Sequence, residues 1–424
     1  MKYAFLNGTI LDGTKDMKPY QATILVNNQK IEKIITEKVD LTDYKQINLQ
    51  GKYIMPGLIN MHVHLAGNGK PQKKQRDNTK LVKTIFSNPI GAMIAKKLVA
   101  NYANLELMSG VTTIRTVGGL RDLDGQIKDE INAGKRIGPR ILTSNQAISV
   151  PNGHMAGSVA VIAETPQQAI DYVNQLNDEH VDLIKLMITG GVLDAKEKGV
   201  PGQLKMDPSI VKAACTRAHE LGLKVAAHVE STQGVLVALE NGVDSIEHGA
   251  KPTEQIINLF KEKNAFVTCT LSPALPYALF DRSISNASEV EQYNGKVVFD
   301  GIVENAKLAL ENNIPVALGN DVGCPWITQY DFYRELHYFT KYVGVTNNFA
   351  IYSATLNNAI LAGIGDITGS IEEGKDADMI VLKHNPLEQL RALRNVEMVL
   401  ARGNLIDHPK VKRNPIIDQQ LDQY

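Results

Sequence analysis

The chain has 424 residues, of which 43% are hydrophobic and 21% charged, and its formal net charge is −1. This length fits one large α/β barrel with an accessory lobe, or two ordinary domains. The near-neutral charge gives no reason to expect a nucleic-acid or anionic-membrane partner. No apolar run approaches the roughly 20 residues of a membrane span, and three scattered cysteines are too few for a disulfide framework. We therefore expect a cytoplasmic protein.

Both ends of the chain have the composition of β-structure. Short alternating β runs occupy residues 1 to about 57, for example at 22–26 and 30–34. Similar runs return at 379–382 and 396–400. We expect residues 1–57 and 366–424 to assemble one small β-sandwich domain and residues 58–365 to form the main domain.

A polar stretch at residues 67–91 separates the first β region from the middle of the chain. It is basic, and carries Lys70, Lys73, Lys74, Arg76, Lys80 and Lys83. A solvated loop is the first interpretation of such a stretch. A lid over a binding site or a contact between subunits of a homo-oligomer is the alternative.

The middle of the chain repeats one pattern, in which Glu is followed by any residue, then Gly or Asn, then an apolar residue. It occurs at residues 220–223, 240–243, 262–265 and 311–314. Gly and Asn tolerate the left-handed conformation that ends a helix, and the short apolar runs that follow suit parallel strands buried on both faces. Such alternation predicts a closed (β/α)8 TIM-like barrel, with an open doubly wound sheet as the weaker alternative.

His62 and His64 form a His-x-His pair behind a Pro-Gly turn. Strand side chains alternate in direction, so two residues separated by one neighbour lie on the same face, about 6–7 Å apart. Two imidazoles placed in this way can converge on one divalent ion. The alternative is that His62 and His64 are two unrelated histidines. The other candidate residues in the chain decide between this interpretation and a metal-binding pair.

Three further side chains are expected at the C-terminal ends of barrel strands, where such barrels carry their active sites. His228 and His248 each lie six residues after an equivalent helix-ending glycine, and Asp321 follows the strand expected to be the eighth. The eighth strand of a closed barrel neighbours the first, which would bring Asp321 beside His62 and His64. Each residue alone could be a core histidine or a turn aspartate.

Lys185 stands inside an apolar strand, between Leu183-Ile184 and Leu186-Met187. A buried, unpaired ammonium tends to lose its proton. A lysine that extends its amine to the strand end is one interpretation. The other is that the neutral amine takes up carbon dioxide, giving a carbamate whose two oxygens bridge two metals.

Together these residues resemble the binuclear signature of the amidohydrolase superfamily. The segments at 56–64, 184–191 and 369–382 look like its branch of imidazolonepropionase-like proteins and metal-dependent Xaa-Pro dipeptidases, or prolidases. The resemblance implies that His62, His64 and Asp321 hold one metal, that His228 and His248 hold the other, and that carboxylated Lys185 and a hydroxide bridge them. Zinc is the first expectation for this donor set. Because imidazolonepropionase proper uses one metal and no such lysine, Lys185 favours the dipeptidase side.

The resemblance also implies a mechanism, in which hydroxide attacks the substrate carbonyl and Asp321 passes a proton to the leaving amine. His154 matches a Gly-His of the branch that contacts substrate, with a structural loop histidine as the alternative. At position 230 some relatives carry a Tyr, whereas this chain has a Glu. The Glu230 carboxylate could bind a substrate amine, or it could cap the next helix. Tyr277 is a weaker candidate for lining the pocket.

The expected activity is hydrolysis of a C–N amide bond, in a dipeptide or an N-acyl amino acid. A cyclic amide, lactone, carbamate or organophosphate is the alternative substrate for the same site. A non-catalytic relative would be expected to lack ligands, yet all six are present. A deaminase would favour a Glu at the third or fourth position after His228, where this chain has Ser231 and Thr232.

Overall fold

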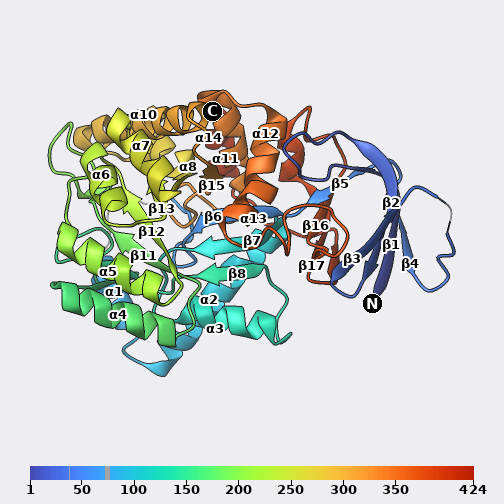
Figure 1. The fold of residues 1–424 in the computed structure, drawn as a ribbon, viewed down its shortest axis with the longest axis horizontal. Helices are drawn as coiled ribbons and strands as arrows, with labels where there is room; N and C mark the ends of the chain where they lie inside the picture. The colour runs from blue at the N-terminus through green and yellow to red at the C-terminus, as the bar shows by residue number, and fades with distance from the viewer. Residues whose placement is uncertain (38, 72–76) are drawn as a thin grey trace.

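The computed structural model describes residues 1–37, 39–71 and 77–424. It consists of an α/β body and a sheet that contains strands from both ends of the chain (Figure 1). Lys73, Lys74 and Arg76 of the basic stretch lie outside the described residues. Among the described helices, none is long and apolar enough to cross a membrane.

Parallel strands form the α/β body. Within the described ranges they pair as a seven-stranded sheet in the order β10-β9-β11-β12-β13-β14-β15 and a three-stranded sheet in the order β6-β7-β8. The strands are β6 (Leu58–Val63), β7 (Val111–Thr116), β8 (Arg140–Thr143), β9 (Ala147–Ser149), β10 (Ala160–Ile162), β11 (Leu183–Met187), β12 (Lys224–Val229), β13 (Ser245–His248), β14 (Phe266–Cys269) and β15 (Val316–Leu318). Apart from the first and last few residues of some strands, these segments are buried throughout, as the apolar runs predicted.

Hydrogen bonds at the strand ends join the two sheets on both sides. The Asp182 amide donates to the Thr143 carbonyl at 2.8 Å, between β8 and β11. On the other side, the Asp321 amide donates to the His62 carbonyl at 2.9 Å and the His64 amide to the Val322 carbonyl at 3.0 Å. The segment after β15 therefore lies directly beside β6, although 253 residues separate Val63 from Val316 in sequence.

Helices surround these strands (Figure 1). They are α1 (Asn78–Ile85), α2 (Pro89–Met108), α3 (Leu123–Asn132), α4 (Pro166–Asp178), α5 (Pro208–Glu220), α6 (Thr232–Glu240), α7 (Glu254–Lys263), α8 (Leu271–Leu279), α9 (Arg282–Ser285), α10 (Glu289–Glu311), α11 (Phe332–Tyr338), α12 (Asn347–Tyr352), α13 (Asn358–Leu361) and α14 (Pro415–Leu421). The predicted helix ends are confirmed: Gly222 and Gly242 have φ of 77° and 99°, and Asn264 ends α7 at φ 51°.

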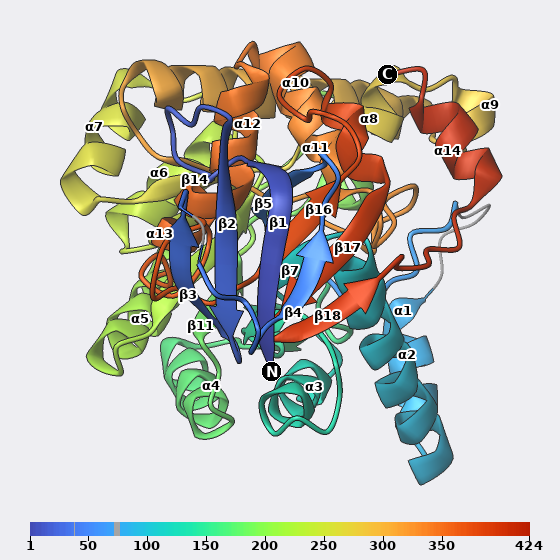
Figure 2. The ribbon, with the colours of Figure 1, turned by 90° about the vertical axis from the view of Figure 1, so that its right-hand side faces the viewer.

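The two ends of the chain share one sheet. Its eight strands, counted over the described residues, are β1 (Lys2–Ile10), β2 (Tyr20–Asn27), β3 (Lys30–Ile35), β4 (Lys45–Asn48), β5 (Tyr53–Pro56), β16 (Met379–Leu382), β17 (Val396–Ala401) and β18 (Asn404–Asp407). Antiparallel pairing of β5 with β16 joins the N-terminal strands to the C-terminal ones. Figure 2 shows the blue and red strands lying side by side. Apolar residues from both ends, such as Phe5 and Met379, pack in one separate core. A sandwich of two sheets remains a prediction.

The polar stretch at 67–91 differs from the predicted loop. Asp77 accepts a hydrogen bond from the Lys80 amide and begins α1, while Asn88 and Pro89 begin α2. Asp77 and Asn88-Pro89 are ordinary signals for the start of a helix. The loop prediction was based instead on the polar and basic composition of the stretch. Thr79 Oγ1 donates to the Ala156 carbonyl at 3.2 Å, so α1 lies against the loop that carries His154. The prediction of a continuous loop is therefore wrong over α1.

Candidate metal centre

The six predicted metal ligands come from five strands or the residues that directly follow them. His62, Lys185, His228 and His248 belong to β6, β11, β12 and β13, whereas His64 and Asp321 follow β6 and β15. Parallel pairing aligns these strands, with Met187 opposite His228 and Val229 opposite His248. The structure thus brings together side chains that span 260 positions of sequence.

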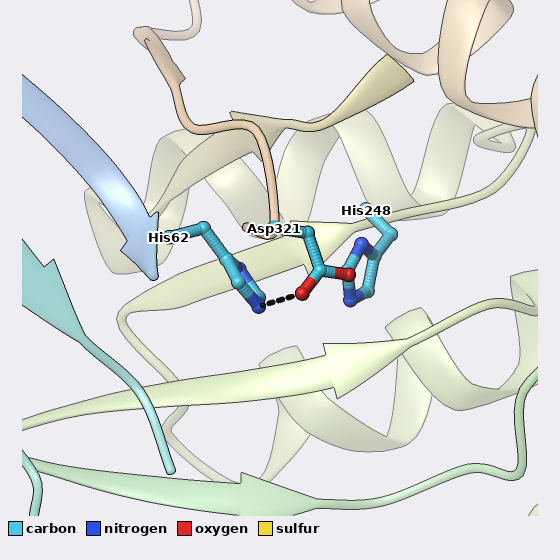
Figure 3. A group of neighbouring side chains, drawn as sticks. All are labelled: His62, His248 and Asp321. Atoms are coloured by element: carbon cyan, nitrogen blue, oxygen red, sulfur yellow. Dashed lines mark ion pairs between the residues drawn. The ribbon is translucent and has the colours of Figure 1, made fainter. Parts of the chain in front are cut away.

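The histidines and Asp321 lie within a few ångströms of one another. The ring of His248 is 4.9 Å from that of His62 and 4.7 Å from that of His228, measured between centroids. Asp321 Oδ1 is 3.6 Å from His62 Nε2 and 3.3 Å from His64 Nε2. Figure 3 shows the Asp321 carboxylate between His62 and His248. Ligand atoms of these three residues all lie within 4.8 Å of one another, as do those of His228, Glu230 and His248.

Two of these residues have backbone conformations that side chains rarely adopt. His248 has φ of 66° and Asp321 has φ of 52°, both in the left-handed region. Left-handed backbone conformations at residues other than glycine cost of order 1–3 kcal/mol, and they persist only where the surrounding structure holds them in place. At the strand ends they turn both side chains toward the centre. Gly319 allows the close approach of the segment after β15 to β6, because a Cβ there would lie 2.5 Å from the Cβ of His62.

Lys185 is fully buried, and its amine has no hydrogen-bond partner among the described residues. Burial lowers the pKa of this amine from 10.5 to about 8, against the opposing effect of the Glu247 and Asp321 carboxylates. About half of the amine is therefore neutral at a pH of about 8. Asp321 Oδ1 also lacks a hydrogen bond within the described part of the chain. Two unpaired polar groups at one buried centre fit a site that binds a cation or another charged group.

Burial favours the neutral form of the four imidazoles. Burial lowers the pKa of His62, His228 and His248 well below the usual value, and that of His64 to a smaller extent. Three of them have Nδ1 within 2.8 Å of an oxygen: His62 of Glu247, His64 of the Gly118 carbonyl and His248 of Thr270. Protonation of Nδ1 leaves Nε2 with the lone pair that a metal requires.

His154 lies at the same centre. Its ring stacks on that of His228, with 4.1 Å between centroids and 5° between planes. Its Nδ1 is 2.6 Å from Asp194 Oδ2, which also accepts a hydrogen bond from the Gly191 amide at 2.8 Å. The sequence analysis missed Asp194. The residue lies in the loop after β11, where no periodic pattern indicates which way its side chain points.

Glu247 was also missed. It directly precedes His248, so strand alternation predicts that the two side chains point to opposite faces. The left-handed conformation of His248 breaks that alternation at the strand end, and Glu247 contacts His62 while His248 also reaches the centre. The signal available in the sequence was a charged residue inside a buried strand.

Glu230 lies beside this group, with a carboxylate oxygen within 4.8 Å of ligand atoms of His228 and His248. Burial and the Asp194 carboxylate raise the pKa of Glu230 to about 8, and its Oε2 lacks a hydrogen bond within the described ranges. A cavity of about 590 Å³ adjoins the centre, lined by Gly190, Gly191, Asp194, Lys205 and Ser231 among others. Tyr277 belongs to α8 and packs against Gly295 of α10, so a role for it in the pocket remains a prediction.

Known proteins resemble this chain over almost its whole length. A model of the Amidohydrolase family matches residues 53–406. Ochratoxinase of Aspergillus niger is 25% identical, over 97% of this chain and 89% of that protein. A putative prolidase from Bifidobacterium longum has a TM-score of 0.87 at 34% identity, covering 100% of this chain and 98% of that one. A Xaa-Pro dipeptidase with bound methionine in its active site has a TM-score of 0.84 at 27% identity, with coverage of 96% and 100%.

Proposed function

Because the chain belongs to the amidohydrolase family and is a hydrolase of carbon–nitrogen bonds, we propose that it uses two divalent metal ions to cleave the amide bond of a dipeptide or an N-acyl amino acid. The observation that carries the proposal is the convergence of His62, His248 and Asp321 beside the buried, unpaired amine of Lys185. The similar solved structures of a prolidase and a Xaa-Pro dipeptidase support a dipeptide as substrate.

The donor set supports two cations rather than one. His62, His64 and Asp321 would hold the first, and His228 and His248 the second, with a carbamate on Lys185 between them. Imidazole and carboxylate donors suit zinc, and manganese or cobalt could replace it. When bound, two such ions lower the pKa of a water molecule toward neutrality and polarise the scissile carbonyl.

The environment of Lys185 supports carboxylation. In the reaction, the lone pair of the neutral amine attacks the carbon of carbon dioxide, a C–N bond forms as one C=O π bond breaks toward oxygen, and the nitrogen loses one proton to solvent. Only an amine with an available lone pair can react in this way, and the lowered pKa of about 8 makes that form far more abundant than it is in an exposed lysine. The resulting carbamate replaces a buried positive charge by a negative one that cations can neutralise.

Asp321 is positioned to move a proton. Its Oδ1 lies within 3.6 Å of both His62 Nε2 and His64 Nε2, and has no hydrogen-bond donor among the described residues. A carboxylate held beside the reacting water can accept its proton and return it to the leaving amine. We assign this transfer to Asp321.

His154 and Glu230 would bind the substrate. Asp194 holds His154 Nδ1, which leaves Nε2 of that ring to donate to or accept from a substrate group. Glu230 Oε2 has no hydrogen-bond partner within the described ranges. Its raised pKa of about 8 keeps it largely protonated until a substrate ammonium group binds and stabilises the carboxylate. The cavity beside Gly190 and Gly191 is in the size range of small-molecule sites. These features favour a dipeptide with a free amine over an N-acyl amino acid.

We also propose that the parallel strands close into a (β/α)8 barrel. The hydrogen bonds from Asp321 to His62 and from Asp182 to Thr143 support this closure. In such a barrel the C-terminal ends of the strands carry the active site, and five of the six proposed ligands lie at or just after strand ends, with Lys185 inside β11. Residues 58–365 would form this domain, and residues 1–57 and 366–424 the smaller one.

A substrate panel tests the proposed reaction. Protein reconstituted with zinc, manganese or cobalt should hydrolyse Xaa-Pro or other dipeptides at least 10²-fold faster than a lactone, a carbamate or a phosphotriester. Metal-free protein should be inactive and recover when metal is restored. Faster turnover of a lactone or phosphotriester, or full activity after complete metal removal, would contradict the proposal.

A further inference from the structure

A network of buried, hydrogen-bonded polar side chains lies next to the candidate metal centre and contacts one of its proposed ligands, His62. Glu247 Oε2 is 2.6 Å from His62 Nδ1, and Glu247 Oε1 accepts from Arg115 Nη2 at 2.7 Å. Arg115 Nε donates in turn to the Met61 carbonyl at 2.7 Å, next to His62 in β6. His62, Arg115 and Glu247 are all buried. This network of side chains connects β6, β7 and β13.

The two ends of the His62 ring have different partners. Nδ1 is 2.6 Å from a carboxylate oxygen, whereas Nε2 is 3.6 Å from Asp321 Oδ1. A neutral imidazole carries one proton, which the short contact assigns to Nδ1. Nε2 then presents its lone pair toward Asp321, and two acceptors facing each other at this distance leave room for a cation between them.

Glu247 differs from the groups that contact Nδ1 of His64 and His248, two of the other proposed ligands. His64 is held by the Gly118 carbonyl and His248 by the Thr270 hydroxyl, both neutral partners. A carboxylate partner makes an imidazole a more basic ligand and fixes its orientation more strongly than a neutral one does. Arg115 compensates the charge of Glu247, which would otherwise be buried without a counter-ion.

We propose that Glu247 and Arg115 are positioning residues that act through His62 and set the affinity of the centre for a divalent metal. Glu247 fixes the tautomer and direction of the ring, and Arg115 fixes Glu247 between β7 and β13. The inference rests on the proposed metal centre, but its test measures metal binding and not turnover.

The test is the zinc dissociation constant of the tighter and weaker sites, measured by competition with a chromophoric chelator. Glu247→Gln should weaken at least one site by 10- to 100-fold. Glu335→Gln is the matched control, since Glu335 is an equally buried carboxylate that accepts from the Leu271 and Ser272 amides instead of a histidine. This control should bind zinc within threefold of the wild type.

Removal of Glu247 alone leaves Arg115 buried without its partner, so a double variant guards against misfolding. Arg115→Met combined with Glu247→Gln removes both charges, and it should show the same loss of zinc affinity if it folds with an unchanged circular dichroism spectrum.

In a His62→Ala background, the Glu247→Gln change should have no further effect on zinc affinity. Wild-type affinity in both Glu247 variants, or an undiminished effect without His62, would overturn the inference. Failure of the wild type to bind zinc would instead overturn the proposed function.

Discussion

His154 and His228 stack face to face, with ring centroids 4.1 Å apart and only 5° between their planes. One ring belongs to the loop after β9 and the other to β12, and Asp194 holds the loop ring at its Nδ1. The contact fixes a loop histidine against a residue that we assign as a metal ligand. His154 therefore lies against the candidate metal centre, where we propose that it contacts substrate rather than metal.

Replacement of His154 by Asn should lower turnover while leaving metal in place. If Nε2 of His154 donates to the substrate carbonyl, loss of that donor should reduce kcat by about 10²-fold. Metal content and kinetics are the two measurements, and His408→Asn is the control because His408 is exposed in the terminal region. An unchanged kcat in the His154 variant would assign that residue a purely structural role.

Asp321→Asn separates metal binding from proton transfer. The amide keeps an oxygen that can coordinate a cation but cannot take up a proton at neutral pH. We expect at least one metal to be retained and kcat to fall by 10²- to 10⁴-fold. Metal analysis and steady-state kinetics test this, with Asp281→Asn at an exposed helix start as the control. Near-normal rates would refute the proton-transfer role of Asp321.

Lys185→Met should stabilise the metal-free, carbon dioxide-free protein at pH 7. The amine has a pKa of about 8 in the folded state against 10.5 otherwise, so below pH 8 folding forces a charged amine into the interior. A difference of 2.5 in pKa corresponds to roughly 3 kcal/mol. Above pH 10.5 the amine is neutral in both states and the cost disappears. Lys185 thus lowers the free energy of unfolding as the pH falls from 10.5 to 8.

Urea denaturation at pH 7 and pH 10 measures this difference. The gain in the free energy of unfolding from Lys185→Met should be largest at pH 7 and much smaller at pH 10. A gain of equal size at both values would show that the cost does not come from ionisation of Lys185. Lys224→Met is the control, because Lys224 is exposed at the start of β12.

Glu230→Gln should reduce the preference for substrates with a free amine. The wild type should cleave a dipeptide such as Leu-Pro at least tenfold more efficiently than 4-methylpentanoyl-proline, which differs only by lacking the amine. In the variant we expect this ratio of kcat/KM values to fall to within about twofold, with metal content unchanged. A ratio that survives in the variant would exclude Glu230 as the amine-binding residue, and loss of metal would identify it as a ligand.

The sequence predicted the parts of the structure that depend on local pattern. The helix-ending glycines at 222 and 242 fixed the depth of His228 and His248, and the isolated charge in a buried strand identified Lys185. The meeting of both ends of the chain in one β region was expected from their composition, and the placement of Asp321 beside His62 from the expected order of strands. These features are determined by periodicity and by topology, both of which can be inferred from residue spacing.

The contacts that were missed depend on tertiary geometry. Glu247 and His248 are neighbours in β13, yet both reach the centre because His248 adopts φ of 66°, which strand alternation does not anticipate. Asp194 reaches His154 across 40 residues of sequence, through a loop whose shape depends on Gly191 and its neighbours. The subunit number and the role of the basic stretch at 67–91 remain predictions, since the structure contains a single chain.

The central claim is that two metals share one centre with a carboxylated lysine. The most direct measurement is the metal content per chain of protein grown with zinc, combined with crystallographic density at the Lys185 side chain. The account predicts two metals per chain and density for a carbamate extending from Nζ. One metal per chain with a free lysine amine would contradict it and would indicate a mononuclear hydrolase.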